Sequence, residues 1–325
     1  MSQDKYDLDQ LRMMTKVSHL YHERGMVQSE ISRTLGLSQA RVSRLLTAAA
    51  DANIIRTVVV APVGLNSDLE DQIEKKYGLL EVHVVDTVDG TDSENAEALG
   101  RVLGNIFTIL PLKDKVVGLQ AWSRSMRKFV DSLGRFPHAK AKSVVELVGG
   151  VGEPALQHEA NSTTARLASI VDAEALFLRV PGVVPSLEMR NAILKNDSHA
   201  RVAMEAMDKL DIALIGVGTC AFRSSRVAFG NFFTQEQFDL AKAKGAVGEI
   251  NLRFVDAHGN PIESELDDLV IGITLEQLSK VDRRIAVSSG EDKHEIILAA
   301  IRGGYVNVLI TDEKTAEYLL KKNIN

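Results

Sequence analysis

From residue 68 onward, short runs of valine, isoleucine and leucine alternate with stretches that have the periodicity of amphipathic helices. Continuous apolar runs are typical of parallel strands buried on both faces, and the helices between them are typical crossover connections. The pattern therefore predicts a doubly wound α/β domain. We expect strands at 81–85, 116–121, 143–148, 175–180, 212–217, 249–255, 269–273, 284–287 and 306–310. We expect helices at 68–77, 93–109, 123–133, 162–171, 291–302 and 313–321.

The first 60 residues have a different pattern, in which three helices follow one another. Apolar residues recur every three or four positions between 8 and 25, and a short second helix is indicated at 28–35, with Ser29 as its expected cap. Gly36 ends this helix, and Ser38 is placed to cap a third helix whose apolar stripe begins at Val42. Two capped helices joined by a tight glycine-containing turn predict a helix-turn-helix.

The polar face of the third helix carries groups that bond to base edges and phosphates. This face contains Ser38, Gln39, Arg41, Ser43 and Arg44. We expect Gln39 and Arg41 to read bases and Arg44 to contact a phosphate, while Gln28 and Ser29 anchor the second helix on the DNA backbone. A three-helix module that binds only protein remains the alternative at this point.

Length and charge support a division into two domains. The chain has 325 residues, and we expect a helix-turn-helix domain at 1–61 and a large domain at 62–325. Residues 1–60 carry eight Lys and Arg against six Asp and Glu, although the whole chain has a net charge of -6. Cys220 is the only cysteine, which fits a reducing cytoplasm and excludes an intrachain disulfide. No apolar run is long enough for a membrane helix, so no membrane partner is expected.

Three loops that follow predicted strands have the composition of ligand-binding loops, because open α/β sheets bind small molecules beyond the carboxyl ends of their strands. The first contains Ser123, Arg124 and Ser125 at a helix start, where an anion or polyol would be stabilised. The second is the glycine-rich stretch 148–152. The third places Lys293 in a first helical turn, where a cation opposes the helix dipole unless it has an anionic partner. The alternatives are an ordinary capped helix for the first loop, a glycine loop without a ligand for the second, and a lysine paired with Glu291 or Asp292 for the third.

Several enzyme classes lack their motifs. Gly216-Val217-Gly218-Thr219 has neither the spacing of a dinucleotide fingerprint nor a following Walker lysine. The eight histidines have no zinc spacing, and no Gly-x-Ser-x-Gly elbow is present. We therefore expect no cofactor, no metal and no catalytic residues.

Taken together, these motifs resemble those of the SorC/DeoR-type family of bacterial sugar-responsive transcription regulators. The resemblance runs through the helix-turn-helix at 28–46 and the segments 245–250 and 254–256. It continues through Ser289, Gly290 and Lys293 and the closing stretch 302–313. The resemblance implies a large domain similar to sugar-phosphate isomerases that binds a sugar, polyol or sugar phosphate without turning it over. It also implies a homo-oligomer, often a tetramer.

The resemblance further implies which residues contact the effector. In such relatives a Trp-Gly-x-Thr-like loop holds phosphate, and the matching residues here are Trp122 to Ser125, with a serine where glycine is usual. The implied effector-binding residues are Ser123, Arg124, Ser125, Glu159, Asn161, Arg223, Glu249 and Lys293. Glu159 stands where a neutral glutamine is common, and a carboxylate there would repel phosphate and accept from hydroxyls.

The leading hypothesis is a cytoplasmic regulator, expected to be a repressor, of a carbohydrate or polyol operon. It would bind double-stranded operator DNA, and its affinity for that DNA would be controlled by a sugar, polyol or sugar phosphate. The alternative is a sugar-phosphate isomerase-like enzyme with an appended DNA-binding domain. A scaffold without a ligand is a third possibility.

Overall fold

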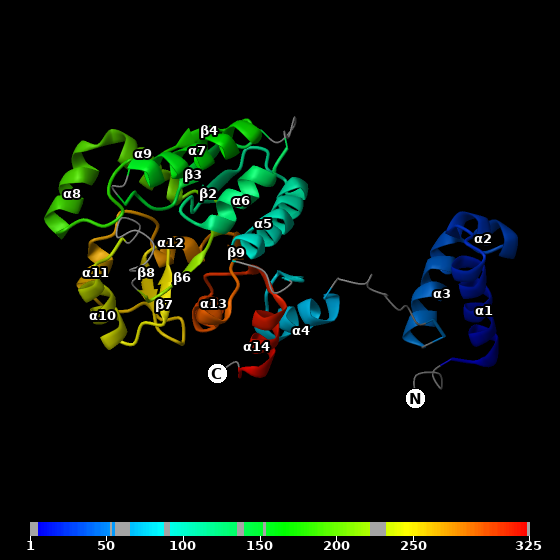
Figure 1. Ribbon diagram of the computed structural model, residues 1–325. Helices are drawn as coiled ribbons and strands as arrows, with labels where there is room; N and C mark the ends of the chain where they lie inside the picture. Colours follow the sequence, from blue (N-terminus) through cyan, green and yellow to red (C-terminus); the bar gives the residue numbers. More distant parts are fainter. Residues whose placement is uncertain are drawn as a thin grey trace. The chain divides into compact units, whose positions relative to one another are not determined.

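The computed structural model describes residues 6–52, 54–55, 66–87, 92–134, 140–151, 154–221 and 232–323 (Figure 1). The chain divides into two compact units, Met1–Pro62 and Val63–Asn325. The sequence at 54–60, Ile-Ile-Arg-Thr-Val-Val-Val, is rich in β-branched residues and is predicted to form a wing or a connection, and most of it lies outside the described residues. Within them, no helix has the length and apolar character needed to cross a membrane.

The first unit is a small helical bundle. It contains α1 (Leu8–Ser18), a π-helical turn η2 (His19–Glu23), α2 (Gln28–Leu35) and α3 (Gln39–Asp51). Its core is formed by four buried side chains, Val17, Leu20, Ile31 and Val42, which come from all four elements. The amphipathic stripes predicted for the three helices therefore meet in one small core, and the helix-turn-helix is confirmed.

The turn between α2 and α3 is defined by the residue that ends α2 and the residue that caps α3. Gly36 has a φ of +63° and ends α2, a conformation that favours glycine. The Ser38 side chain accepts a hydrogen bond from the Arg41 amide at 3.2 Å and so caps α3. The expected cap at Ser29 is wrong, because α2 begins one residue after Val27, whose amide donates to the Glu30 carboxylate at 3.1 Å.

The second unit is built on a parallel seven-stranded sheet with the order β1-β10-β9-β5-β2-β3-β4. The chain runs from β2 through β3 to β4 toward one edge, and from β5 through β9 to β10 toward the other. The order therefore reverses between β2 and β5. The strands are β1 (Glu81–Val85), β2 (Val116–Leu119), β3 (Ser143–Glu146), β4 (Glu174–Leu176), β5 (Ile212–Ile215), β9 (Arg283–Val287) and β10 (Val308–Asp312).

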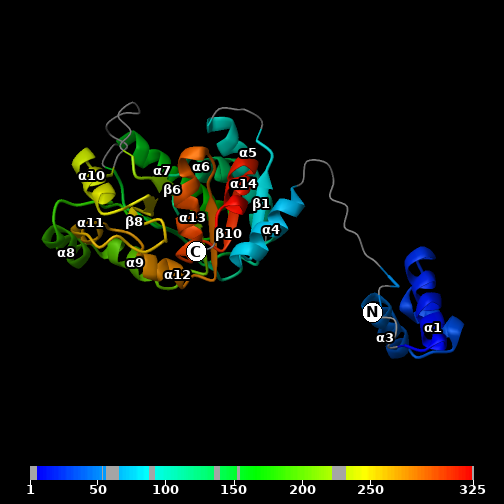
Figure 2. The same cartoon turned by 90° about the horizontal axis from the view of Figure 1, so that it is seen from below.

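Helices cover both faces of this sheet, as the sequence pattern predicts. Side chains of α5, α6 and α7 form one core cluster with residues such as Val117 and Val144, and α5 and α6 lie side by side (Figure 1 and Figure 2). Side chains of α4, α9, α13 and α14 join a second cluster with residues such as Val116 and Val145. Alternate strand residues thus face opposite cores. These helices are α4 (Ser67–Tyr77), α5 (Asp92–Ile109), α6 (Arg124–Ser132), α7 (Pro154–Ile170), α9 (Ser198–Met207), α13 (His294–Arg302) and α14 (Glu313–Lys321).

The remaining elements are shorter or less buried, and they include a second, antiparallel sheet with the order β6-β7-β8. Its strands are β6 (Val217–Thr219), β7 (Gly248–Ile250) and β8 (Arg253–Val255). The other helices are α8 (Leu187–Asn196), α10 (Gln235–Ala243), α11 (Glu265–Asp268), α12 (Leu275–Ser279) and a 3-10 turn η4 (Glu291–Lys293).

Two predicted strands are wrong. The run 249–255 is a hairpin, because Asn251 and Leu252 have φ values of +50° and +68° and turn the chain between β7 and β8. The run 269–273 makes only isolated bridges, and the buried Arg253 side chain holds it in place. Its guanidinium donates to the carbonyls of Gly272 and Ile273, each at 3.2 Å, and pairs with the Asp267 carboxylate at 2.9 Å.

Candidate functional site

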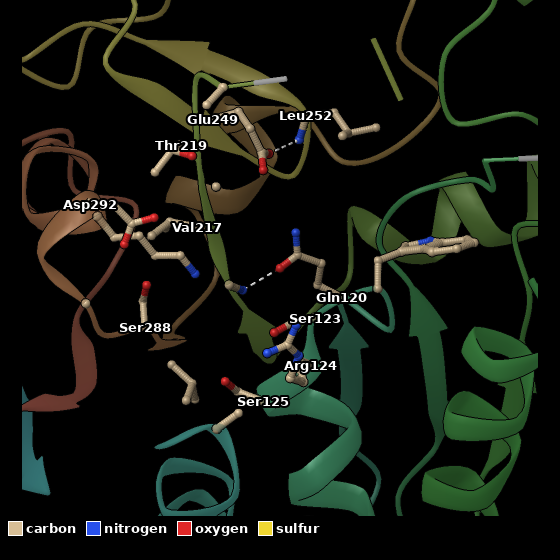
Figure 3. A pocket seen from close by; sticks show the side chains of 18 of the residues that line it. Gln120, Ser123, Arg124, Ser125, Val217, Thr219, Glu249, Leu252, Ser288 and Asp292 are labelled. Carbon is tan, nitrogen blue, oxygen red and sulfur yellow. Dashed lines mark hydrogen bonds between the residues drawn. The ribbon is translucent and has the colours of Figure 1, made fainter. Parts of the chain in front are cut away.

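A pocket of about 550 Å³ opens at the carboxyl ends of β2, β5 and β9 (Figure 3). Its lining includes the residues that directly follow these strands, namely Gln120, Gly216 and Ser288. Because the strand order reverses between β2 and β5, the pocket lies at the topological switch point of the sheet. This is the usual ligand position in an open α/β fold.

Gln120 links β2 and β5, the two neighbouring strands between which the strand order reverses. Its Oε1 atom accepts a hydrogen bond from the buried amide of Gly216 (Figure 3). A Cβ atom at residue 216 would lie 2.9 Å from that oxygen and 3.2 Å from Ser123 Oγ. Glycine at this position therefore allows the chain after β5 to approach the loop after β2.

One wall of the pocket is the start of α6, where positive charge collects. Ser123 is the N-cap residue of this helix, and its first turn contains no acidic side chain. Arg124, Ser125 and Arg127 line the pocket together with Ser123. The guanidinium groups add to the positive end of the helix dipole, so this wall stabilises an anionic group.

The opposite wall carries carboxylates and a lysine. Glu249 on β7 accepts a hydrogen bond from the Leu252 amide at 2.6 Å, and burial raises the pKa of its carboxyl, with the nearby Lys293 acting in the opposite direction (Figure 3). Asp292 and Thr219 also line this side. Carboxylates accept hydrogen bonds from hydroxyl groups, so this wall suits the polyol part of a ligand.

Ser288 supplies an unpartnered polar atom between the two walls. Its side chain is 2% exposed, and its Oγ atom has no hydrogen-bond partner within the described residues. The hydroxyl faces the pocket (Figure 3). Buried hydroxyls are normally hydrogen-bonded, so this atom is positioned to bond to a ligand.

Five of the predicted effector residues line this pocket. They are Ser123, Arg124, Ser125, Glu249 and Lys293. Glu159 and Asn161 on α7 do not line it. Glu159 pairs with Arg127, and Asn161 accepts a hydrogen bond from the Gln157 side chain at 2.9 Å. Arg223 lies outside the described residues.

Sequence reasoning missed several polar residues of the lining, among them Gln120, Arg127 and Ser288. Ser288 could have been found, because it directly follows the predicted strand 284–287 and so must lie at the carboxyl edge of the sheet. Gln120 was placed inside the strand expected at 116–121, whereas β2 ends at Leu119. Arg127 had no comparable signal, since it lies one helical turn inside α6.

The predicted DNA-contacting residues form an accessible face. The five α3-side residues Ser38, Gln39, Arg41, Ser43 and Arg44 are exposed, and Gln28 and Ser29 of α2 are half-buried. The buried stripe of α3 contains Val42 and Ala49, so packing leaves its arginine face outward. This face can enter a major groove.

No group of three or more His, Cys, Asp or Glu side chains that could hold a metal ion occurs among the described residues. Cys220 is buried and its Sγ atom lies 3.6 Å from the Phe238 carbonyl oxygen.

Known proteins share both units of this chain. A model of the family described as "Putative sugar-binding domain" matches residues 61–321. The sorbitol operon regulator of Klebsiella pneumoniae is 28% identical over 314 residues, which cover 96% of this chain and 99% of that protein. The deoxyribonucleoside regulator of Bacillus subtilis is 30% identical over 315 residues, which cover 97% of this chain and 99% of that protein.

The fold comparison agrees with the sequence comparison. The crystal structure of the full-length sorbitol operon regulator SorC from Klebsiella pneumoniae matches with a TM-score of 0.73 and 28% identity, covering 96% of this chain and 100% of that one. The predicted fold class is confirmed by the parallel sheet and by this match. The chain belongs to the SorC/DeoR-type family of transcription regulators with a sugar-binding domain.

Proposed function

We propose that this protein is a repressor of a carbohydrate or polyol catabolic operon whose affinity for operator DNA is controlled by a sugar, a polyol or a sugar phosphate. In this proposal residues 1–61 bind DNA and residues 62–325 bind the effector and form a homo-oligomer, expected to be a tetramer, in the cytoplasm. The observation that carries the proposal is a pocket with a cationic wall and an acidic wall in a chain that also exposes the arginine face of α3.

The two walls support binding of the ligand's anionic group on one side of the pocket and of its hydroxyl groups on the other. An anionic group would bind at Ser123, Arg124 and Ser125, where the helix dipole and a guanidinium act together. The hydroxyl groups would reach Glu249 and Lys293 on the opposite side. A sugar or polyol with an anionic end would satisfy both walls at once.

We propose binding without turnover. The Glu249 carboxylate already accepts a hydrogen bond from Leu252, which supports a role in positioning hydroxyls. The isomerase alternative requires an acid–base pair placed on one substrate carbon. Incubating the purified protein with pentose and tetrose phosphates tests it, and turnover that is lost in Lys293→Ala would establish an enzyme.

The DNA-binding part is tested by selecting from a pool of random duplexes with the full chain and then measuring fluorescence polarisation at several salt concentrations. A regulator enriches one sequence, and its affinity for that sequence falls with salt because counterions are released. Binding that is equal for all duplexes would overturn the proposal.

The effector part is tested by a thermal-shift screen of sugars, polyols and their phosphates, because a ligand that binds the native state raises its stability. A hit must then change the affinity for the selected duplex, commonly by about 5- to 150-fold. A hit that binds but leaves DNA affinity unchanged would contradict control by that ligand.

A further inference from the structure

We propose that Glu159 competes with the anionic group of the effector for Arg127, and thereby sets how strongly the pocket prefers anionic over neutral ligands. This inference rests on the proposed function, since it concerns the same pocket. It assigns a role to an ion pair between α6 and α7 that the sequence analysis did not identify.

Arg127 belongs to the cationic wall. Its amide donates to the Ser123 carbonyl at 3.1 Å, so it lies one helical turn after the N-cap, on the same side of α6. Its side chain lines the pocket and is 32% exposed. The wall therefore contains a second guanidinium in addition to that of Arg124.

The same guanidinium is paired with a carboxylate outside the lining. Arg127 Nη1 donates to Oε2 of Glu159 on α7. The other cation of this helical turn, Lys128, is directed to the neighbouring helix α5, where it lies 3.6 Å from Glu97. Arg127 is thus shared between the pocket and α7.

This pair is weak enough to be exchanged. The Glu159 side chain is 55% exposed, and ion pairs with this much solvent contact contribute little. A phosphate or carboxylate of a ligand can bond to a guanidinium through two oxygens, in a less exposed place and next to the positive end of α6. Such a group would take Arg127, and Glu159 would turn to solvent.

A ligand site is indicated independently of these charges. Ser288 Oγ is buried, unpartnered within the described residues and faces the same pocket (Figure 3). A neutral polyol can bond to the acidic wall, but it has no charge with which to displace Glu159. Glu159 consequently lowers affinity for anionic ligands and leaves that for neutral ligands unchanged.

The chain offers a matched control for the test. Arg166 on α7 pairs with Asp131 on α6 at 2.9 Å, and neither residue lines the pocket. Asp131→Asn therefore removes one negative charge and one α6–α7 ion pair, as Glu159→Gln does, without changing Arg127. The full chain is titrated calorimetrically with inorganic phosphate and, separately, with sorbitol as a neutral probe.

We expect Glu159→Gln to tighten phosphate binding about fivefold, the range in which a half-exposed ion pair acts, and to leave sorbitol binding unchanged. Asp131→Asn should change neither by more than about twofold. In an Arg127→Gln background, Glu159→Gln should produce no gain, because the guanidinium for which it competes is absent.

Three results would overturn the inference: no gain in Glu159→Gln, an equal gain in Asp131→Asn, or a gain that persists without Arg127. Absence of phosphate binding in both the unchanged protein and Glu159→Gln also counts against it. These failures are distinct from failure of the proposed function, which would appear as the absence of sequence-specific DNA binding or of any effector response, including a response to neutral polyols.

Discussion

The amide of Gly216 donates a hydrogen bond to the side-chain oxygen of Gln120 across the point where the strand order reverses. One residue directly follows β2 and the other directly follows β5, so this bond joins the two halves of the sheet at the floor of the pocket. Polar side chains in such a position have a structural role as well as a place in the binding site.

Gln120→Leu should therefore lower the free energy of unfolding by about 1–3 kcal/mol, because the buried Gly216 amide loses its acceptor. Urea unfolding of the full chain measures this change. The exposed Gln235 on α10 donates to the Asp239 side chain at 2.8 Å, and Gln235→Leu should change stability by less than about 0.5 kcal/mol. Equal effects of the two substitutions would show that the Gln120 bond is unimportant.

Arg41→Ala should weaken binding to the selected duplex by about 1–3 kcal/mol and relax the preference at one base pair, as expected for a residue that reads a base edge. Arg44→Ala should weaken binding to all sequences alike and reduce the slope of affinity against salt by about one, as expected for a phosphate contact. Both side chains are exposed on α3, so neither substitution should unfold the unit.

Polarisation titrations on the selected duplex and on single-base variants separate the two roles. If both alanine variants lost affinity equally for every duplex, the assignment of Arg41 to a base would be contradicted. Circular dichroism of each variant provides the folding control.

Lys293→Ala should leave operator affinity intact and weaken the effector response about tenfold or more, because a charge-assisted bond to the ligand is lost. The observation behind this expectation is that Lys293 lines the pocket beside Asp292. Effector titrations of the protein–DNA complex measure the response. Loss of DNA binding itself would instead make Lys293 a structural residue.

Glu249→Gln should remove part of the pH dependence of stability. Burial raises the pKa of the Glu249 carboxyl in the folded protein, so the folded state holds its proton more tightly than the unfolded state does. The associated stability is fully present below about pH 4.3, the usual carboxyl value, and is lost as the pH rises through the higher folded-state pKa. The side-chain amide introduced by Glu249→Gln can still accept from the Leu252 amide through its oxygen, but it does not titrate. The variant should therefore not lose this stability as the pH rises.

The measurement is the difference in unfolding free energy between the two proteins from acidic to neutral pH. Glu276→Gln is the control, because Lys280 lowers the pKa of the Glu276 carboxyl and the pH dependence that this carboxyl adds to stability has the opposite sign. A constant difference between the unchanged protein and Glu249→Gln across this range would contradict the expectation.

The parallel sheet could be predicted from sequence because strands that are buried on both faces consist of nearly continuous apolar residues. The predicted bounds of β1 and α14 match the structure, and β9 differs by one residue. In contrast, α8 has no buried residue and α11 and α12 are only four and five residues long, so none of them has an apolar stripe that could indicate a helix. The β7–β8 turn uses Asn251 and Leu252 without a glycine, so nothing interrupts the alternation of polar and apolar residues over 249–255, which is the pattern of a single strand.

The pocket was predictable to the extent that its residues follow strands. Ser123, Arg124 and Ser125 were found because a strand is followed there by a helix start, and Lys293 was found because a cation in a first turn is unusual. The pairing of Arg127 with Glu159 could not be predicted, because the residues lie on two separate helices that come together only in the folded chain.

The Arg253 side chain connects the hairpin at the pocket to the segment 267–273. The hairpin that presents Glu249 is braced through this guanidinium against Gly272, which in turn bridges to Val148 just beyond the end of β3. A molecule that draws the hairpin inward must therefore strain or shift the segment 267–273. Such a movement would reach, beyond the hairpin, the chain that leaves the half of the sheet that contains β3 and β4.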